Sequence, residues 1–204
     1  MREGDVDFPL ARQGVFRTIQ GEGVMLGLPM VFVRFAGCSI GCPGCDTDYK
    51  KRGKASREEI VKACLALATP ACNWVWLTGG EPTDHAIGPL IEDLRSHRLK
   101  VALATAGHKR QPDRWANGGV DFLSVSPHDP AAWVQDWGQE LKLVPGLNGF
   151  SLKDFEPKLP GLFGECFVSP CDGKPETVQE CVDWVLARPR WRLNCQAHKQ
   201  WSIA

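Results

Sequence analysis

The amino-acid sequence predicts an α/β protein with a partial, open βα barrel and mostly parallel strands. Three observations lead to this prediction. Short apolar segments alternate with segments of helical periodicity, an order typical of parallel strands joined by crossover helices. The apolar segments are nearly continuous runs, as expected for strands that are covered on both faces. The βα units are too few to close a full eight-stranded barrel, so an open barrel is the better interpretation.

Seven short apolar segments are expected to be the strands. In chain order they are residues 30–37, 74–78, 99–105, 121–126, 140–144, 165–169 and 191–196. Polar or glycine-rich stretches follow these segments, among them "TGGEPTD", "TAGH", "SPHD", "SPCDG" and "QAHK". Because the carboxyl ends of parallel strands meet at one rim, we expect these stretches to gather there and to form the ligand site.

Three segments show helical periodicity, namely residues 56–68, 86–98 and 175–188. The first opens with Ser56 and Glu59, which have the spacing of a capping box. Gly88 and Pro89 either restrict the second helix to its later part or place Pro89 in its first turn. The residues expected on the buried faces of the first and third helices are Ile60, Cys64, Leu67, Val178, Cys181, Val182 and Val185.

Length and charge limit the class of protein. The 204 residues suit one domain, spanning residues 1–204, with a sizeable core. Lys plus Arg and Asp plus Glu both number 24, and this zero net charge gives no reason to expect nucleic acid or an anionic membrane as a partner. The apolar runs are too short for a membrane span, and the charged N-terminal stretch lacks the apolar core of a secretory signal. We therefore expect a cytoplasmic protein.

The nine cysteines are better explained as metal ligands or buried thiols than as disulfides in a reducing compartment. Cys64 and Cys181 lie on the apolar faces of expected helices and are interpreted as buried thiols. No second close-spaced group is found among the cysteines outside residues 38–45, which are Cys64, Cys72, Cys166, Cys171, Cys181 and Cys195.

Cys38, Cys42 and Cys45 form a C-x3-C-x2-C motif directly after the first expected strand. A structural zinc site needs four closed ligands. A [4Fe–4S] cluster held by three cysteines keeps one iron open, where a small molecule can bind and receive an electron. The motif therefore favours a catalytic iron–sulfur cluster, with a zinc site that recruits a distant fourth ligand as the alternative.

This motif resembles the signature of the radical S-adenosylmethionine (SAM) superfamily, and "TGGEP" at 78–82 resembles its second mark. Glycines in such a loop let the backbone approach a ligand closely. The stretches "TIQGEG", "CDTDY", "VSP", "ELK" and "SPCDG", with the tail "RWRLNCQAHKQWSIA", resemble the 7-carboxy-7-deazaguanine synthase family. The resemblance runs in the same order from about residue 14 to the C-terminus.

The resemblance implies a radical SAM barrel and a defined reaction. Members of this family convert 6-carboxy-5,6,7,8-tetrahydropterin to 7-carboxy-7-deazaguanine, with ring contraction and loss of ammonia, for queuosine and other 7-deazapurine pathways. The implied cofactors are a [4Fe–4S] cluster, SAM and Mg2+. The implied partners are the small-molecule pterin substrate, an electron donor such as flavodoxin or ferredoxin, and a second copy of the chain in a homodimer.

The resemblance also implies site residues. Cys38, Cys42 and Cys45 are the implied catalytic cluster ligands, Thr47 is the implied Mg2+ ligand, and Asp46 is a second candidate for the metal, which prefers oxygen ligands. The implied SAM-binding residues are Gly44, Cys45, Asp46, Gly80, Ser126, Pro127, His128, Ser169, Pro170, Cys171 and Asp172. The implied substrate-binding residues are Ile19, Gln20, Gly21, Glu22, Arg34, Thr78, His198 and Ala204.

Physical chemistry agrees with part of this assignment. The Arg34 guanidinium suits the carboxylate of the substrate, and Gln20 and Glu22 can hydrogen-bond its amino-pyrimidine edge. The polar tail residues Gln196, His198 and Lys199 are expected at the mouth of the pocket, where the tail would close over the pterin. Trp201 and Ile203 are apolar and are expected to pack rather than face water.

Two stretches depart from the family pattern. Where the family commonly has "ETNG", this chain has "ATAG" at 104–107, and the side chains of Ala104 and Ala106 make no polar contact. Where the family often has Ser-Pro-Lys, this chain has Ser-Pro-His, and His128 can donate a hydrogen bond without being a fixed charge.

Two other function classes stay open from the motifs alone. A glycyl-radical-enzyme activating enzyme has the same cluster spacing, but the "TIQGEG" block and the "QAHK" tail favour the pterin enzyme. A non-catalytic binding module stabilised by zinc or an Fe–S cluster would not cleave SAM. Direct binding of tRNA has no support from the zero net charge.

Overall fold

One nine-stranded sheet organises the structure. The computed structural model describes residues 7–113, 118–159, 161–172 and 174–203. The strands are β1 (Phe8–Ile19), β2 (Pro29–Phe35), β3 (Gly53–Ala55), β4 (Trp74–Gly79), β5 (Lys100–Thr105), β6 (Phe122–Val125), β7 (Trp137–Leu143), β8 (Leu162–Val168) and β9 (Trp191–Leu193). The helices are α1 (Arg57–Leu67), α2 (Gly88–Ser96), α3 (Glu176–Ala187) and α4 (Ala197–Gln200), and the 3-10 helices are η1 (Pro82–Asp84) and η2 (Leu152–Lys158).

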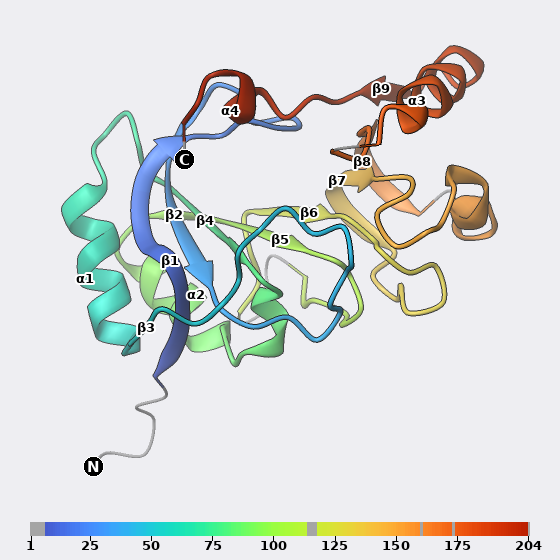
Figure 1. Ribbon diagram of the computed structural model, residues 1–204. Helices are drawn as coiled ribbons and strands as arrows, with labels where there is room; N and C mark the ends of the chain where they lie inside the picture. Colours follow the sequence, from blue (N-terminus) through green and yellow to red (C-terminus); the bar gives the residue numbers. More distant parts are fainter. Residues whose placement is uncertain (1–6, 114–117, 160, 173, 204) are drawn as a thin grey trace.

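The sheet is open and mostly parallel (Figure 1). Its strand order is β3-β1-β2-β4-β5-β6-β7-β8-β9, and each pair of neighbours from β2 to β9 is parallel. Strand β1 pairs antiparallel with both β2 and β3. Because β3 and β9 are the two ends of this order, the sheet does not close on itself. The predicted fold class, a partial and open βα barrel, is confirmed.

The predicted elements are present, with small shifts of their ends. The seven expected strands are β2 and β4 to β9, and the three expected helices are α1, α2 and α3. Ser56 caps α1 as predicted, because its hydroxyl accepts a hydrogen bond from the Glu59 amide and the Glu59 carboxylate accepts one from the Ser56 amide. Strand β9 ends at Leu193, three residues before the predicted end at residue 196.

Strand β1 is the largest element that the sequence did not predict. Its twelve residues contain a register shift between Leu10 and Val15, where Gln13 and Gly14 adopt φ angles of 71° and 52°. This irregularity breaks the period of two by which a half-buried strand is identified. The short elements β3, α4, η1 and η2 were also not predicted, because three to seven residues carry too little periodicity.

The two faces of the sheet bury different side chains. The larger core lies on the face that packs against α1, α2 and α3 and includes Val33, Leu77, Leu103 and Leu123. The other face carries a smaller apolar layer, formed by Met25, Met30, Phe32, Trp76, Ala102 and Phe122. Because side chains alternate along a strand, the inner face continues from this layer to polar residues nearer the strand ends. The charged side chains of Arg34, Glu140 and Lys142 therefore share this face with the apolar residues Phe32 and Trp76.

One expectation about helix burial is wrong. Val178 was expected on the buried face of α3, but 44% of its surface is exposed. Thr177, Cys181 and Trp184 are the buried residues of this helix, since it packs with Trp184 against Trp191. Cys64 and Cys181 are fully buried thiols, as predicted. Among the described helices, none is long and apolar enough to cross a membrane.

Candidate active site

Two adjoining cavities lie at the carboxyl ends of the parallel strands. The first, here called the cluster cavity, has a volume of about 240 Å³ and is lined by Cys38, Cys42 and Cys45. The second, here called the inner cavity, has a volume of about 170 Å³ and lies over the apolar floor formed by Phe32 and Trp76. The residues that line both cavities are Glu22, Asp46, Thr47, Thr78, Gly79, Ala104, Ser126, Lys142 and Gln196. The motifs therefore gather at one rim, as predicted.

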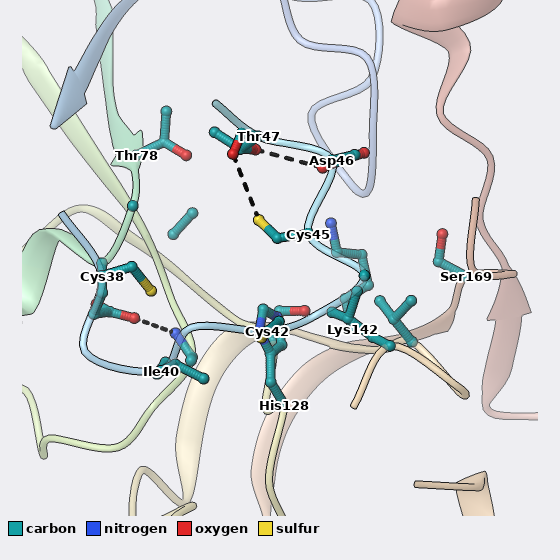
Figure 2. A pocket seen from close by; sticks show the side chains of 18 of the residues that line it. Cys38, Ile40, Cys42, Cys45, Asp46, Thr47, Thr78, His128, Lys142 and Ser169 are labelled. Carbon is teal, nitrogen blue, oxygen red and sulfur yellow. Dashed lines mark hydrogen bonds between the residues drawn. The ribbon is translucent and has the colours of Figure 1, made fainter. Parts of the chain in front are cut away.

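The loop after β2 brings the three motif cysteines to one space (Figure 2). The Gly37 amide donates to the Tyr49 carbonyl at 2.9 Å and joins the two ends of the loop, and within the loop the Cys45 amide donates to the Cys42 carbonyl at 3.2 Å. Within the described residues, no three His, Cys, Asp or Glu side chains converge closely enough to hold a single metal ion. A cubane cluster makes a different demand, because its thiolate ligands bind separate irons.

The chemistry of these thiols fits a cationic group. Burial and the nearby Cys45 and Cys38 raise the pKa of Cys42 to about 11. Burial also raises the pKa of Cys45, although hydrogen bonds with Thr47 act in the opposite direction. Cys42 and Cys45 therefore favour the protonated form until a positive group replaces their protons. Iron ions supply that charge, and the donor set therefore fits an iron–sulfur cluster.

Gly80 lets the "TGGEP" loop press against the cysteine loop. A Cβ atom at Gly80 would lie 1.7 Å from the Gly37 carbonyl oxygen and 3.3 Å from the Cys38 Cβ. Only a glycine fits a contact this close. The loop after β4 and the loop after β2 are thus packed backbone to backbone beside the first cluster cysteine.

Glu81 ties the end of β4 to the end of β5. Its buried carboxylate accepts hydrogen bonds from the Thr83 amide and hydroxyl, from the Thr105 hydroxyl at 2.8 Å and from the Ala106 amide at 2.8 Å. The "ATAG" stretch therefore contributes Thr105 and a backbone amide to this network, while Ala104 and Ala106 line the cluster cavity without polar side chains. This arrangement was not predicted from the sequence.

Asp84 holds the cysteine loop from the other side. Its carboxylate accepts hydrogen bonds from the Ser39 amide at 2.8 Å, from the Ser39 hydroxyl at 2.9 Å and from the Lys109 ammonium at 2.9 Å. Burial opposes its ionisation, but the bonds from Lys109 and Ser39 outweigh burial and lower the pKa of Asp84 to about 2. Because Ser39 follows Cys38 directly, this ionised carboxylate fixes the start of the cysteine loop.

Arg34 and Thr78 lie side by side on the inner face, since they are register partners in the β2–β4 pair. The Arg34 guanidinium carbon lies 5.0 Å from the centre of the Phe16 ring, so an aromatic face supports the cation. Burial lowers the pKa of Arg34, against the influence of Asp46. The inner cavity brings together the substrate residues that the sequence indicated, namely Ile19, Gln20, Gly21, Glu22, Arg34, Thr78 and His198. The remaining one, Ala204, lies outside the described residues.

Glu22 and Lys142 form an ion pair inside both cavities. Burial opposes the charge on Glu22, but the Lys142 ammonium and hydrogen bonds from Lys142 and Gln196 lower the pKa of Glu22. Burial also opposes the charge on Lys142, but the nearby Glu22 carboxylate has the larger combined effect and raises the pKa of Lys142. Both side chains are therefore charged, which gives the pocket one fixed acceptor and one fixed donor. Lys142 was not among the predicted site residues.

Glu140 fastens the "QGEG" stretch to the sheet. Its carboxylate accepts hydrogen bonds from the Val24 amide and from the Ser124 hydroxyl, both at 2.7 Å. The Gly23 amide donates to the Asn194 side chain at 3.0 Å, and a Cβ at Gly23 would lie 2.1 Å from Glu140 Oε2. Charged residues at alternate positions of an apolar strand, as in "ELK", were the signal that could have identified Glu140 and Lys142.

The C-terminal tail covers the rim. Helix α4 lies beside the loop between β1 and β2 (Figure 1), where the Ala197 amide donates to the Gly21 carbonyl at 3.0 Å. Gln196 donates to Glu22 at 3.1 Å and to Asp46 at 3.0 Å, so the tail contacts both cavities as expected. Trp201, by contrast, was expected to pack but is 48% exposed.

The region indicated for Mg2+ lies where the cavities meet. Thr47 lines both cavities, and its hydroxyl donates to Asp46 Oδ1 at 3.4 Å. The other oxygen of Asp46 accepts from Gln196 and from Lys199. The Lys199 ammonium therefore already balances the charge of the Asp46 carboxylate. Among the described residues, the Thr47 hydroxyl makes only one long hydrogen bond, to Asp46, and so is the freer of the two groups to bind a metal.

The SAM-binding residues that the resemblance implied collect around the cluster cavity. Those that line it are Gly44, Cys45, Asp46, Gly80, Ser126, His128, Ser169, Pro170, Cys171 and Asp172. Pro127 is buried between two of them and is not part of the lining. The ring of His128 faces Cys42, with 3.0 Å between Nδ1 and Sγ, and burial together with Lys142 lowers the pKa of His128 to about 4.

Comparisons with known proteins identify the family and agree with the fold. Residues 32–133 match the model of the radical SAM superfamily. The 7-carboxy-7-deazaguanine synthase of Nitratidesulfovibrio vulgaris is 33% identical, over 93% of this chain and 96% of that protein. The enzyme of the same name from Bordetella pertussis is 32% identical, over 93% and 96%. The crystal structure of QueE from Escherichia coli superposes with a TM-score of 0.71 at 24% identity, over 94% of this chain and 95% of that chain.

Proposed function

The chain belongs to the 7-carboxy-7-deazaguanine synthase family of the radical SAM superfamily, and from this premise we propose how its residues carry out the reaction. The protein is a radical SAM enzyme that forms 7-carboxy-7-deazaguanine from 6-carboxy-5,6,7,8-tetrahydropterin, with loss of ammonia, in queuosine biosynthesis. The observation that carries the assignment of residues is the junction of two cavities, one lined by three cysteines and one by charged side chains over an aromatic floor.

Cys38, Cys42 and Cys45 would hold the [4Fe–4S] cluster. When bound, the cluster supplies the electron for reductive cleavage of SAM. The role of the protein around it is positional: Gly80 and Asp84 fix the cysteine loop from two sides. Ser126, Ser169 and the backbone of the loops after β4 and β8 would surround SAM, since they line the same cavity.

Arg34 and Lys142 would orient the pterin in the inner cavity. The Arg34 guanidinium is a permanent cation and would pair with the substrate carboxylate. Glu22 would accept hydrogen bonds from the amino-pyrimidine edge, because Lys142 keeps it ionised. The apolar floor below, with Phe32 and Trp76, would contact the face of the ring. Polar groups above and an aromatic surface below are the usual features of a site for a flat heterocycle.

Thr47 would be the protein ligand of Mg2+. Its hydroxyl lies where the two cavities meet, and Mg2+ commonly completes its shell with water and substrate oxygens. A metal at this place would lie between the substrate and the cluster loop. Asp46 would act less as a ligand than as an anchor, since Lys199 and Gln196 already engage its carboxylate.

We further propose that the enzyme works in the cytoplasm as a homodimer, reduced by a flavodoxin or ferredoxin. Similarity to the synthase family supports this proposal. All nine cysteines are free in the structure, as a reducing compartment would keep them.

Anaerobic mass spectrometry tests the function. The reconstituted enzyme is incubated with SAM, a reductant and 6-carboxy-5,6,7,8-tetrahydropterin, and product and 5′-deoxyadenosine are measured. We expect both, and neither from a variant with Cys38, Cys42 and Cys45 replaced by Ala. SAM cleavage without 7-carboxy-7-deazaguanine would contradict the substrate, and four irons per chain in the triple variant would contradict the cluster ligands.

A further inference from the structure

His128 lines the cluster cavity, and its ring also contacts one of the three motif cysteines, Cys42. Its Nδ1 lies 3.0 Å from Cys42 Sγ, although the two residues are 86 positions apart in the sequence. Figure 2 shows the two side chains next to each other at the base of the cysteine loop. Cys42 is also the most buried of the three, with 7% of its surface exposed. The contact therefore lies in the wall of the cluster cavity, at the most buried of the three motif cysteines.

The direction of this hydrogen bond follows from the chemistry of a ligand thiolate. A thiolate bound to iron has no proton, so it can only accept a hydrogen bond, and the donor must be Nδ1–H of His128. Cys45 differs in this respect, because its thiol donates to the Thr47 carbonyl at 3.8 Å, a contact that a thiolate cannot keep. Cys42 is thus a ligand sulfur with a donor side chain already placed.

The loop around His128 supports the same atom. Asn148 donates from Nδ2 to the His128 carbonyl at 3.2 Å, which fixes the loop after β6 to the loop after β7. The backbone of His128 is therefore held in place by a second loop while its ring contacts Cys42.

We propose that His128 is a positioning residue that donates a hydrogen bond from Nδ1 to the Cys42 thiolate and thereby raises the reduction potential of the cluster. The inference rests on the assignment of Cys42 as a cluster ligand. A hydrogen bond to a ligand sulfur stabilises the additional negative charge of the reduced state, and such bonds are one of the factors that set iron–sulfur potentials. The imidazole offers this donor whether neutral or protonated, so the effect does not require a change of its charge.

Two substitutions separate hydrogen bonding from packing. In His128→Asn the amide nitrogen can occupy the place of Nδ1, whereas His128→Leu keeps bulk and removes the donor. Cluster potentials of the wild type and both variants are measured by redox titration followed by electron paramagnetic resonance, without SAM or substrate. We expect a more negative potential in His128→Leu, a potential near the wild-type value in His128→Asn, and equal iron content in all three proteins.

Several outcomes would overturn the proposal. A fully loaded His128→Leu protein with the wild-type potential excludes the hydrogen bond, as does an equal shift in both variants. If His128→Leu does not retain its cluster, 15N-histidine labelling of the wild type decides: a 15N coupling to the reduced cluster, lost in His128→Asn, supports the proposal, and its absence contradicts it. A Cys42→Ala protein that retains the full cluster would instead overturn the ligand assignment, and the proposal with it.

Discussion

Lys199 of the last helix binds Asp46, the residue that follows the last cluster cysteine, with 2.5 Å between Nζ and Oδ2. The same ammonium lies 2.7 Å from the Asp172 carboxylate in the loop after β8. One side chain of the tail thus joins two segments of the cavity rim that are far apart in the sequence. These ion pairs attach the tail to the site together with the hydrogen bonds of Gln196 and Ala197, whereas Trp201 is about half exposed.

Replacing Lys199 with Met should loosen the tail. Partly exposed ion pairs contribute about 1 kcal/mol, so we expect the KM for the pterin to rise about fivefold, with more SAM cleaved per product formed. Steady-state kinetics and the ratio of 5′-deoxyadenosine to product measure this. Lys62→Met, an exposed residue on α1, is the control and should change neither quantity. Wild-type KM and coupling in Lys199→Met would show that the ion pairs do not hold the tail.

The Glu22–Lys142 pair should make stability depend on pH. The pKa of Glu22 is lowered in the folded state, so its contribution is present above the ordinary value of 4.5 and is lost as pH falls through the folded value. The pKa of Lys142 is raised above its ordinary 10.5, so its contribution is lost only as pH rises beyond the folded value. The pair is therefore intact throughout the neutral range.

Thermal unfolding of the wild type, Lys142→Met and the double variant Glu22→Gln with Lys142→Met measures this contribution. We expect Lys142→Met to lose on the order of 3 kcal/mol at neutral pH, because it leaves Glu22 charged and unpaired, and the double variant to recover part of the loss. The difference between wild type and double variant should shrink as pH falls below 4.5. A difference that stays constant with pH would contradict the charged pair.

Gly80→Ala should disrupt the cluster site. The new Cβ would lie 1.7 Å from the Gly37 carbonyl oxygen, so one of the two loops must move away from the other. We expect reconstituted iron content to fall well below that of the wild type. Gly88→Ala is the matched control, because a Cβ at Gly88 meets no atom within 4 Å, and this variant should load fully. Equal iron in both variants would show that the backbone contact is not needed.

Thr47→Val should weaken the response to Mg2+. The substitution keeps the shape of the side chain and removes its only oxygen, so a hard cation loses its protein ligand. We expect activity to rise with Mg2+ in the wild type and much less in Thr47→Val, at matched ionic strength, while iron content stays the same. Thr69→Val, in the loop after α1, is the control. An unchanged Mg2+ response in Thr47→Val would place the metal elsewhere.

The sequence predicted the features that a local pattern of residues determines. It did not predict the features that depend on how distant strands pair and which face a side chain lies on. Cys38, Cys42 and Cys45 were assigned from their spacing, and the rim was predicted because loops after parallel strands meet at one edge. Lys142 was not assigned, because placing it opposite Glu22 requires the inner face of β7 to be known. Strand β1 was missed because its bulge at Gln13 and Gly14 breaks the alternation of the pattern.

The apolar layer below the inner cavity also closes one end of that cavity. Phe32, Trp76 and Phe122 are each less than a tenth exposed, so side chains fill the bottom of the partial barrel. The end of the inner cavity opposite this floor is lined by the tail residues Gln196 and His198. A tail that covers a site in this way has two opposing effects: tighter closure excludes water from the reaction, and looser closure lets the product leave faster.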